Sequence, residues 1–428
     1  MEQTKYLVVG SSHAALEAVT AIRMHDATGS LTLLTRDPHL PYSPTVLPYV
    51  VSGRSAPDGI FLRDEKFFAD QGVQLKRGTA LKALHTERNA AELADGSEIA
   101  YEKILLATGA SPAIPPIPGI DTVSYHVLRT LDDATRLNAA IKQSKQAVVL
   151  GAGLVGMHAA ENLVKVGAGV TVVEMAKQLT DGYFDAIAAG LIEKAFTDNG
   201  ARILTGSRVV KLAPSAASFG TPATPATPGV TLTLESGATL EADLLLVATG
   251  VKPNMDYLVG SPVEHDRGIL VSDTMQSSVA NVWSAGDCAQ AKGFFTDDKV
   301  MNAILPDAAE QGRIAGMAMA GDSGLKKYPG GVPLNTYHFF GRHAISVGSS
   351  KVPEGAEVLT RFDEVSGRYL KAIFKNGCLL GIYGVNEFFD GGVMCQLILR
   401  RIDLSPVKER FLAEPMTVGR EIMSKTWR

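Results

Sequence analysis

The sequence predicts an α/β protein with two Rossmann-like dinucleotide-binding domains and a C-terminal α+β domain that forms interfaces. Three observations support this fold class. A glycine-rich turn follows an apolar strand twice, at Gly10 and at Gly151. Two further apolar strands end in the tripeptide Ala-Thr-Gly, at 107–109 and at 248–250. The chain of 428 residues is also too long for one compact core, so two or three domains are expected.

The clearest unit is segment 147–175. An apolar strand runs into the turn Gly151-Ala-Gly153-Leu-Val-Gly156, and a helix and a second β-branched strand follow. In a Rossmann unit the first glycine permits the tight turn, the second lets the backbone approach a pyrophosphate, and the third lets the helix pack on its strand. The positive end of that helix faces the phosphates. This segment therefore predicts a dinucleotide site.

Glu174 ends the second strand, about 20 residues after the turn, where a carboxylate accepts both ribose hydroxyls and repels a 2′-phosphate. Met175 and Ala176, which come next, offer no arginine for such a phosphate. The sequence therefore favours NADH over NADPH.

The first unit is less regular. Its turn reads Gly10-Ser-Ser12-His-Ala-Ala15 between the strands 6–9 and 31–34. Serine in place of the second glycine still allows fairly close backbone approach and adds a hydroxyl for phosphate, and alanine in the third place is an accepted variant. The second strand ends in Thr35-Arg36-Asp37 instead of a plain carboxylate. Taken alone, this turn leaves a nucleotide site and a packing turn equally open.

Proline and glycine mark the remaining loops. Segment 38–49 contains four prolines, which exclude a regular helix interior, so we expect an ordered loop that lines a pocket. Residues 213–229 are proline-rich and of low complexity, which indicates a solvated hairpin extension. Another apolar strand ends in Ala-Gly286-Asp287, and Pro306 opens a helix over 307–321 whose N-terminus is suited to stabilise negative charge.

Domain boundaries follow from the proline-rich linker at 112–118 and from the two Ala-Thr-Gly strands on either side of the central unit. We expect a split first domain (1–114 and 246–325), a second domain inserted into it (115–245), and a third domain (326–428) without a nucleotide turn. The apolar and aromatic run NEFFDGGVMCQLILRR in the third domain indicates either a docking surface or an ordinary core or homodimer seam.

Composition and charge narrow the class of function. A net charge of -4 argues against nucleic acid as the main partner, and no apolar stretch approaches the ~20 residues of a membrane-spanning helix. The first strand begins by about Lys5, which leaves no room for a signal peptide, so a cytoplasmic protein is expected. The three cysteines form no C-x-x-C pattern, so neither disulfides nor a bound metal or iron–sulfur cluster is expected.

The two turns, the paired Ala-Thr-Gly segments and the late Ala-Gly-Asp strand together resemble the FAD-dependent pyridine nucleotide–disulfide oxidoreductase superfamily over essentially the whole chain. The resemblance implies FAD in the first domain, NAD in the second, and hydride transfer between nicotinamide and flavin, with the flavin as the catalyst. The implied FAD-binding residues are Gly10, Ser12, His13, Ala14, Thr35, Arg36, Ser43, Pro44, Ala107, Thr108, Gly109, Arg129, Gly286, Asp287 and Pro306. The implied NAD-binding residues are Gly151, Gly153, Leu154, Val155, Gly156, Glu174 and Gly250.

The departures from that family bear on function. Its disulfide-reducing members carry two early cysteines and its peroxidase or oxidase members carry one, whereas this chain has none before Cys288. Direct disulfide exchange and sulfenic-acid chemistry are therefore excluded. Many members pair a flavin-side lysine with a glutamate, and Tyr49 and His158 stand at the matching positions. Both are expected near the ring, His158 more as a spacer beside the nicotinamide than as an acid–base group, and no catalytic side chain is assigned.

Without a cysteine relay, the natural second partner is a one-electron carrier such as an iron–sulfur protein. The stretches PHLPYSPTVLPYVVSG, TYHFFGRHAISVGSS, YGVNEFFDGG and REIMSKTWR are further similar to FAD subunits of 2-oxoacid oxidoreductase complexes that contain thiamine diphosphate and iron–sulfur subunits. This resemblance implies a subunit that takes electrons from the iron–sulfur partner and reduces NAD+. The alternatives are a free-standing NADH:ferredoxin or rubredoxin reductase, an NADH oxidase, and a flavin-stabilised scaffold with negligible turnover.

Overall fold

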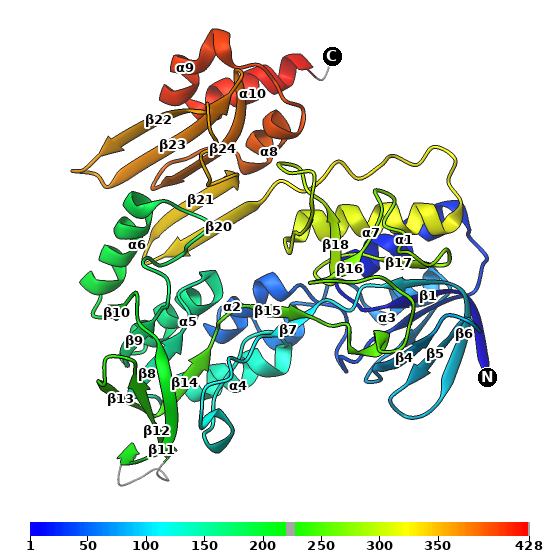
Figure 1. The fold of residues 1–428 in the computed structure, drawn as a ribbon, viewed down its shortest axis with the longest axis horizontal. Coiled ribbons are helices and arrows are strands. Elements are labelled where there is room, and N and C mark those ends of the chain that lie inside the picture. The colour runs from blue at the N-terminus through cyan, green and yellow to red at the C-terminus, as the bar shows by residue number, and fades with distance from the viewer. Residues whose placement is uncertain (220–226, 427–428) are drawn as a thin grey trace. The chain divides into compact units, whose positions relative to one another are not determined.

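The computed structural model describes residues 1–219 and 227–426 and divides into two compact units (Figure 1). Unit 1 contains residues 1–47, 55–111 and 251–331, and unit 2 contains residues 48–54, 112–250 and 332–428. Each unit is discontinuous in sequence, because the chain leaves unit 1 for unit 2 and later returns. The division into three domains, with boundaries at 114/115, 245/246 and 325/326, stays a prediction.

Unit 1 is built on a seven-stranded sheet in the order β3-β2-β1-β6-β5-β4, with β17 paired to β6. The strands β3, β2, β1, β6 and β17 are parallel, and β4, β5 and β6 form an antiparallel edge. These strands are β1 (Glu2–Val9), β2 (Leu31–Leu34), β3 (Val73–Lys76), β4 (Leu81–His85), β5 (Ala90–Leu93), β6 (Glu98–Leu106) and β17 (Val282–Ser284). Smaller sheets contain β7 (Ala110–Pro112) with β15 (Val251–Pro253), and β16 (Ile269–Leu270), β18 (Ala289–Lys292) and β19 (Lys299–Met301).

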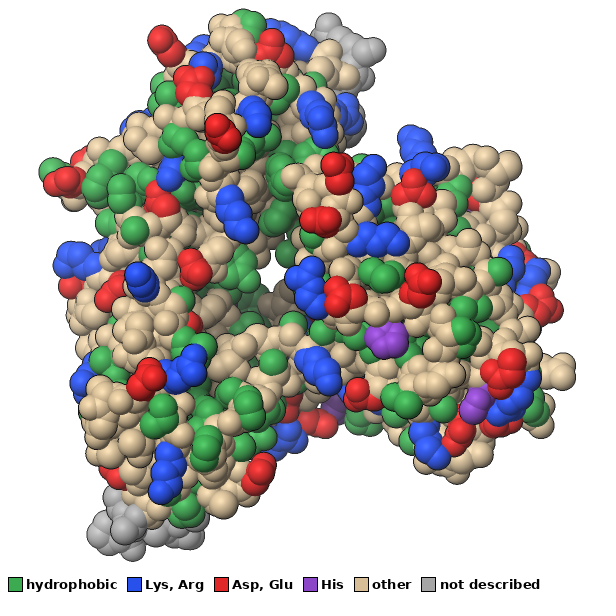
Figure 2. Space-filling model, viewed as in Figure 1, with side chains coloured by type: hydrophobic (Ala, Val, Ile, Leu, Met, Phe, Trp, Pro, Cys, Tyr) green, Lys and Arg blue, Asp and Glu red, His purple; other side chains and the backbone are tan. Residues whose placement is uncertain are grey.

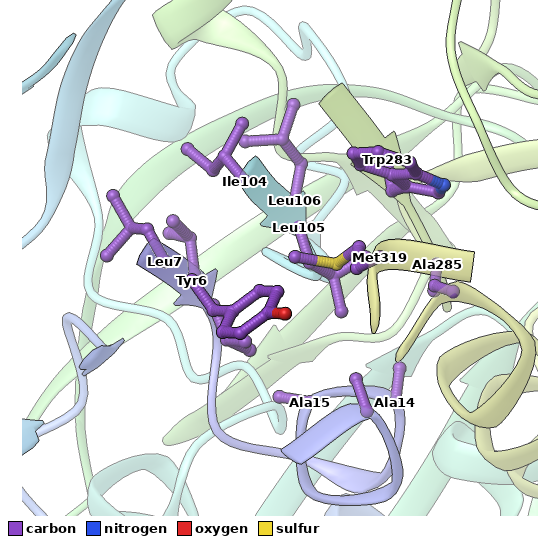
Figure 3. Packing of buried hydrophobic residues seen from close by; sticks show 14 of the residues in the cluster. Tyr6, Leu7, Ala14, Ala15, Ile104, Leu105, Leu106, Trp283, Ala285 and Met319 are labelled. Atoms are coloured by element: carbon purple, nitrogen blue, oxygen red, sulfur yellow. The ribbon is translucent and has the colours of Figure 1, made fainter. Parts of the chain in front are cut away.

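The core of unit 1 lies between this sheet and two long helices, α1 (His13–His25) and α7 (Leu305–Ala320). Figure 3 shows strand side chains such as Leu105 and Trp283 beside Ala15 of α1 and Met319 of α7. The strands are nearly continuous apolar runs because both faces of a parallel sheet are covered. A short helix, α3 (Glu65–Asp70), completes the unit, with the Asp64 carboxylate accepting from the Phe67 N–H at its N-terminus.

The first half of unit 2 is a second Rossmann-like sheet of four parallel strands in the order β10-β9-β8-β14. An antiparallel sheet, β11-β12-β13, accompanies it. The strands are β8 (Gln146–Leu150), β9 (Gly169–Val173), β10 (Arg202–Leu204), β11 (Val209–Phe219), β12 (Thr227–Leu234), β13 (Thr239–Ala242) and β14 (Leu244–Val247). The helices are α2 (Leu47–Val51), α4 (Leu131–Ile141), α5 (Leu154–Lys165) and α6 (Ala186–Asp198).

The C-terminal part of unit 2 is a five-stranded antiparallel sheet, β20-β21-β24-β23-β22, followed by three helices. It is joined to the nucleotide part by polar contacts: the Asp185 carboxylate, which caps α6, accepts from the Tyr369 hydroxyl (2.7 Å) and the Lys371 ammonium (3.0 Å). The elements are β20 (Leu334–Phe339), β21 (Arg342–Gly348), β22 (Glu357–Asp363), β23 (Arg368–Lys375), β24 (Cys378–Val385), α8 (Gly391–Leu399), α9 (Lys408–Ala413) and α10 (Pro415–Thr426).

Several local expectations can be compared with these elements. The proline-rich segment 38–49 was expected to form a loop, but its end forms the one-turn helix α2, because Pro48 lies in a first turn where no backbone N–H is needed. The hairpin extension is present as β11 and β12, and its tip, 220–226, lies outside the described residues. In NEFFDGGVMCQLILRR, Met394, Leu397 and Ile398 are buried core, whereas Phe388 is 69% exposed.

The two Rossmann-like sheets and the C-terminal sheet confirm the predicted α/β class. Within 1–219 and 227–426, no helix combines the length and the apolar character that crossing a bilayer requires.

Candidate functional site

The turn at Gly151 has the geometry of a dinucleotide-binding loop. Gly151 has φ +100°, and a Cβ there would lie 2.4 Å from the Ala248 carbonyl oxygen, so no other residue fits. A Cβ on Gly156 would lie 2.1 Å from the Gly151 oxygen, which keeps α5 close to its strand. By contrast, a Cβ on Gly153 would meet nothing within 4 Å. The space above Gly153 is thus open to a ligand, which is what the backbone needs to approach a pyrophosphate.

The open space belongs to a cleft of about 860 Å³ in unit 2, a volume typical of small-molecule sites. It is lined by the turn, by the end of β9 and by the segment that follows β14 (Gly151, Gly153, Glu174, Met175, Ser207, Arg208, Ala248, Thr249 and Gly250 among them). The cleft therefore brings together Gly151, Gly153, Glu174 and Gly250 of the predicted NAD residues. Leu154 and Val155 open α5 beside it.

Glu174 is fixed by the turn that it accompanies. One carboxylate oxygen accepts from the Ala152 N–H (2.7 Å) and the other from the Ala176 N–H (2.8 Å). A carboxylate has about four acceptor positions, so two remain for ribose hydroxyls. The same cleft contains Arg208, an exposed cation that sequence reasoning missed because it comes from the segment before β11 and carries no local motif.

The turn at Gly10 is more crowded. Gly10 has φ +124°, and a Cβ there would lie 2.0 Å from the Ala107 carbonyl oxygen. A Cβ on Gly286 would contact the Ala14 methyl at 3.3 Å. The ends of β1, β6 and β17 therefore meet at the start of α1, and four predicted FAD residues (Gly10, Ala14, Ala107 and Gly286) lie there together. Ser12 is the N-cap residue of α1 and makes no side-chain cap hydrogen bond.

Side-chain hydrogen bonds tie this turn to its neighbours. The Ser11 hydroxyl donates to the Thr35 hydroxyl (3.1 Å), and the His13 ring lies 2.8 Å from the Ser43 hydroxyl, which precedes Pro44. Burial lowers the pKa of His13, so its neutral ring is favoured at pH 7. Arg36 donates to the Ser111 hydroxyl (3.0 Å). The first two contacts connect the turn at Gly10 with the segment after β2 and with the proline-rich segment, and the third connects Arg36 with Ser111.

Asn254, which sequence reasoning did not assign, joins two parts of unit 1. Its side-chain amide donates to the Thr108 carbonyl (2.8 Å), its backbone N–H donates to the Gly109 carbonyl (3.0 Å), and its side-chain oxygen accepts from Ser111 (2.7 Å). The Thr108 hydroxyl donates in turn to the Asn254 carbonyl (2.9 Å). These hydrogen bonds thus connect the predicted Ala-Thr-Gly segment at 107–109 with Asn254, which follows the second such segment at 248–250.

Around the Ala-Gly-Asp strand, a buried polar group faces the start of α7. The Gly286 N–H donates to the side-chain oxygen of Gln311, which is buried, and Asp287 follows on the same turn. Pro306 lies in the first turn of α7, next to Asp307. Burial raises the pKa of Asp307 to about 7, and one of its oxygens, Oδ2, has no hydrogen-bond partner among the described residues. Gln311 and Asp307 carry no motif that reveals them in the sequence.

The two residues expected near the flavin ring, Tyr49 and His158, lie in one cleft of about 550 Å³ in unit 2. The His158 ring packs edge-on against buried Tyr337, with centroids 4.8 Å apart. Burial lowers the pKa of His158, so a neutral imidazole is favoured at pH 7. Arg129 precedes α4 in the same unit, and its backbone N–H donates to Asp133 (3.1 Å). The contacts of Tyr49, His158 and Arg129 with FAD stay predictions.

The chain belongs to the pyridine nucleotide–disulphide oxidoreductase family, whose model matches residues 4–320. It is therefore an oxidoreductase with FAD and NAD(H) as cofactors, which confirms the predicted class and cofactors. The open space over Gly153 fits one such dinucleotide, and Gly10 forms the tight turn that the binding of a second one requires.

Among individual relatives, the chain is similar to NADH-dependent phenylglyoxylate dehydrogenase subunit epsilon from Aromatoleum evansii. The two are 72% identical over 429 residues, which cover 100% of this chain and 99% of that protein. The fold is that of putidaredoxin reductase in its covalent complex with putidaredoxin (TM-score 0.85, 23% identity, 99% of both chains). It is also that of the NADH-bound, water-forming NADH oxidase from Lactobacillus brevis (TM-score 0.83, 22% identity, 94% and 92% of the two chains).

Proposed function

We propose that this chain is the FAD-containing, NAD-reducing subunit of an NADH-dependent phenylglyoxylate dehydrogenase. In this role it takes electrons from an iron–sulfur partner subunit and reduces NAD+ to NADH. Subunits that use thiamine diphosphate would oxidise the 2-oxoacid and form benzoyl-CoA during anaerobic aromatic degradation. The observation that carries the proposal is the 72% identity to the epsilon subunit over the whole of both chains.

The cysteines support a one-electron partner. Cys288 is fully buried, and its thiol donates to the Leu106 carbonyl (3.3 Å). Cys378 and Cys395 are partly buried, and neither lines the dinucleotide cleft or the cleft of Tyr49 and His158. A dithiol relay needs two cysteines that approach each other beside the flavin, so these three residues do not supply one. Electrons from the partner therefore go to FAD without a protein thiol.

When bound, FAD supplies the link between single-electron carriers and the two-electron couple NAD+/NADH. The residues of the chain bind and orient the cofactors. Gly153 leaves its backbone accessible to a pyrophosphate, and Glu174, which lines the same cleft, would accept the ribose hydroxyls. A neutral His158 brings no charge to this place, which supports the proposal that it positions the nicotinamide.

The proposal is tested by anaerobic mixing of the purified, FAD-loaded chain with NADH while the flavin absorption band is followed. A one-electron dye or oxygen is then added in separate runs. Rapid bleaching, fast dye reduction and slow oxygen consumption are expected of an electron-transfer subunit. Fast oxygen turnover would instead identify an NADH oxidase, and absence of bleaching would leave the scaffold interpretation.

A second measurement separates the complex subunit from a free-standing reductase. Affinity capture of the tagged chain from cells grown anaerobically on phenylglyoxylate is expected to retain iron–sulfur and thiamine diphosphate subunits in fixed ratio. A chain that is recovered alone, but reduces a soluble ferredoxin or rubredoxin at full rate, would contradict the proposed complex.

A further inference from the structure

The cleft that contains Tyr49 and His158 has an unusual set of charges. Its walls come from four separate segments of unit 2: residues 48–54, the end of α4, one face of α5, and the turn between β20 and β21. Each segment contributes one cation, and these are Arg54, Lys142, Lys165 and Arg342. Glu161 is the carboxylate among the lining residues. Four cations less one carboxylate leave three positive charges, in a chain whose net charge is -4.

The single carboxylate is already engaged. Glu161 is buried, and its Oε1 accepts from the Phe340 N–H (2.7 Å) and pairs with the Lys165 ammonium (2.7 Å). Among the described residues, no carboxylate lies within 4.0 Å of the charged groups of Arg54, Lys142 or Arg342. On the face shown in Figure 2, by comparison, acidic and basic side chains are intermixed. The cleft is therefore a local concentration of uncompensated positive charge, which a concave surface strengthens.

The shape of the cleft also favours a ligand of a particular kind. Its volume of about 550 Å³ lies in the usual range of small-molecule sites. Val51, Ile141 and Phe339 give it a buried apolar floor. Tyr49 is 41% exposed, and the Arg54 guanidinium lies over its ring, 5.1 Å from the ring centroid. A guanidinium held over an aromatic ring is ordered in place, and its N–H donors are then available to an anion.

We infer that this cleft binds a small phosphate-bearing anion of about nucleotide size, at a place distinct from the dinucleotide cleft. Two guanidinium groups offer paired N–H donors that match phosphate oxygens, and Lys142 and Lys165 add point charges. The dinucleotide cleft shares no lining residue with this one. The inference does not depend on the identity of the electron donor, so it stands or falls separately from the proposed function.

Calorimetric titration of the FAD-loaded protein with inorganic pyrophosphate tests the inference. The titration is run without NAD+ and again after saturation with NAD+, because His158, which is expected beside the nicotinamide, also lines this cleft. Binding that persists after saturation reports on a site other than the dinucleotide cleft. We expect saturable binding that weakens steeply with added salt. In Arg54→Gln/Arg342→Gln, binding of pyrophosphate is expected to fall at least tenfold. Lys194→Gln, which removes an exposed lysine of α6 in the same unit, is the matched control and is expected to bind normally.

Two outcomes would overturn the inference. One is an absence of pyrophosphate binding at millimolar concentration, which is what a cleft that docks only an acidic protein surface would give. The other is binding that the double substitution does not change. If the double variant fails to fold, as judged by its thermal unfolding and FAD content, Lys142→Gln replaces it, because that side chain is exposed. Lys142→Gln is expected to weaken pyrophosphate binding about threefold or more, and unchanged binding would count against the inference.

Discussion

The two glycine turns of this chain share one plan and differ in their surroundings. Each follows a parallel strand and leads into a helix. Each begins with a glycine of positive φ, where an added Cβ would clash with a neighbouring carbonyl oxygen. In unit 2 the next glycine, Gly153, faces open space, and Glu174 is held beside it by two backbone N–H groups. In unit 1 that place is taken by Ser12, and Ser11 and His13 on either side are hydrogen-bonded to Thr35 and Ser43.

This difference matches what each turn has to do. A cofactor that stays bound gains from many fixed polar contacts around it, because each immobilised group is already ordered before binding. A cofactor that must bind and leave in every cycle needs an open cleft and few obstacles. Unit 1 has the first character and unit 2 the second, in agreement with retained FAD and exchangeable NAD(H).

The largest expected effect comes from the first glycine of the crowded turn. In Gly10→Ala the new Cβ would lie 2.0 Å from the Ala107 oxygen at a φ that alanine avoids. We expect the free energy of unfolding to fall by about 2–5 kcal/mol and FAD to be lost on purification. Chemical denaturation and the flavin-to-protein absorbance ratio measure both. Gly78→Ala, at a positive φ with open space around it, is the control and should cost about 1 kcal/mol.

Asp307, which lies in unit 1, adds a pH dependence to the stability of the protein. Its carboxyl is protonated in the folded state up to a pKa of about 7, whereas an unfolded aspartate has a pKa of about 3.9. The resulting stability is fully present below about pH 4 and is lost as the pH rises through 7. Relative to Asp307→Asn, the wild type should therefore lose up to about 4 kcal/mol between pH 4 and pH 8. Parallel pH-dependence in both proteins would contradict this, and exposed Asp58→Asn is the control.

The same comparison shows what the sequence reveals and what it hides. Apolar runs and prolines set local structure, so the strand 31–34 has the predicted bounds, and the helix expected over 307–321 is α7 (Leu305–Ala320). Fold class and the turn at Gly151 follow from such local signals, whereas the nucleotide role of the turn at Gly10 follows only from the resemblance to the family. By contrast, Asn254 acquires its role by reaching Thr108, 146 residues earlier in the chain.

Contacts of that kind depend on how sheets and loops pack. Their residues have no fixed separation in the sequence, so no sequence motif reveals them. Arg208 in the dinucleotide cleft and Glu161 in the cleft of Tyr49 and His158 are likewise positioned by packing and not by a local motif. The predicted roles of Arg129 and Asp287 at FAD likewise rest on resemblance to the family and not on any local pattern.

A change of cofactor preference tests the role of the open turn at Gly151. In Glu174→Gln/Met175→Arg, the carboxylate that repels a 2′-phosphate is removed and a guanidinium is added at the exposed side chain next to it. Glutamine keeps one acceptor oxygen for one of the two backbone N–H groups and loses the other, so thermal unfolding checks that the double variant stays folded. We expect the ratio of kcat/KM for NADPH to that for NADH to rise about 10- to 100-fold, or about 1.4–2.8 kcal/mol. Met175→Arg alone is the control, and an unchanged ratio in the double variant would show that Glu174 does not lie at the ribose.

The smallest effect, and the one that most directly separates the two turns, is Gly153→Ala. Its φ is -72° and its Cβ would meet no protein atom within 4 Å, so the free energy of unfolding should change by no more than about 0.5 kcal/mol. The methyl group instead occupies space that the pyrophosphate needs, and NADH affinity should fall about tenfold, equivalent to about 1.4 kcal/mol. FAD content should not change, because Gly153 belongs to unit 2 and FAD is assigned to the turn of unit 1. Fluorescence titration with NADH measures the affinity. If Gly153→Ala instead lowers the free energy of unfolding and leaves NADH affinity unchanged, the open side of this turn does not face the dinucleotide. The proposed difference between the two glycine turns would then be wrong.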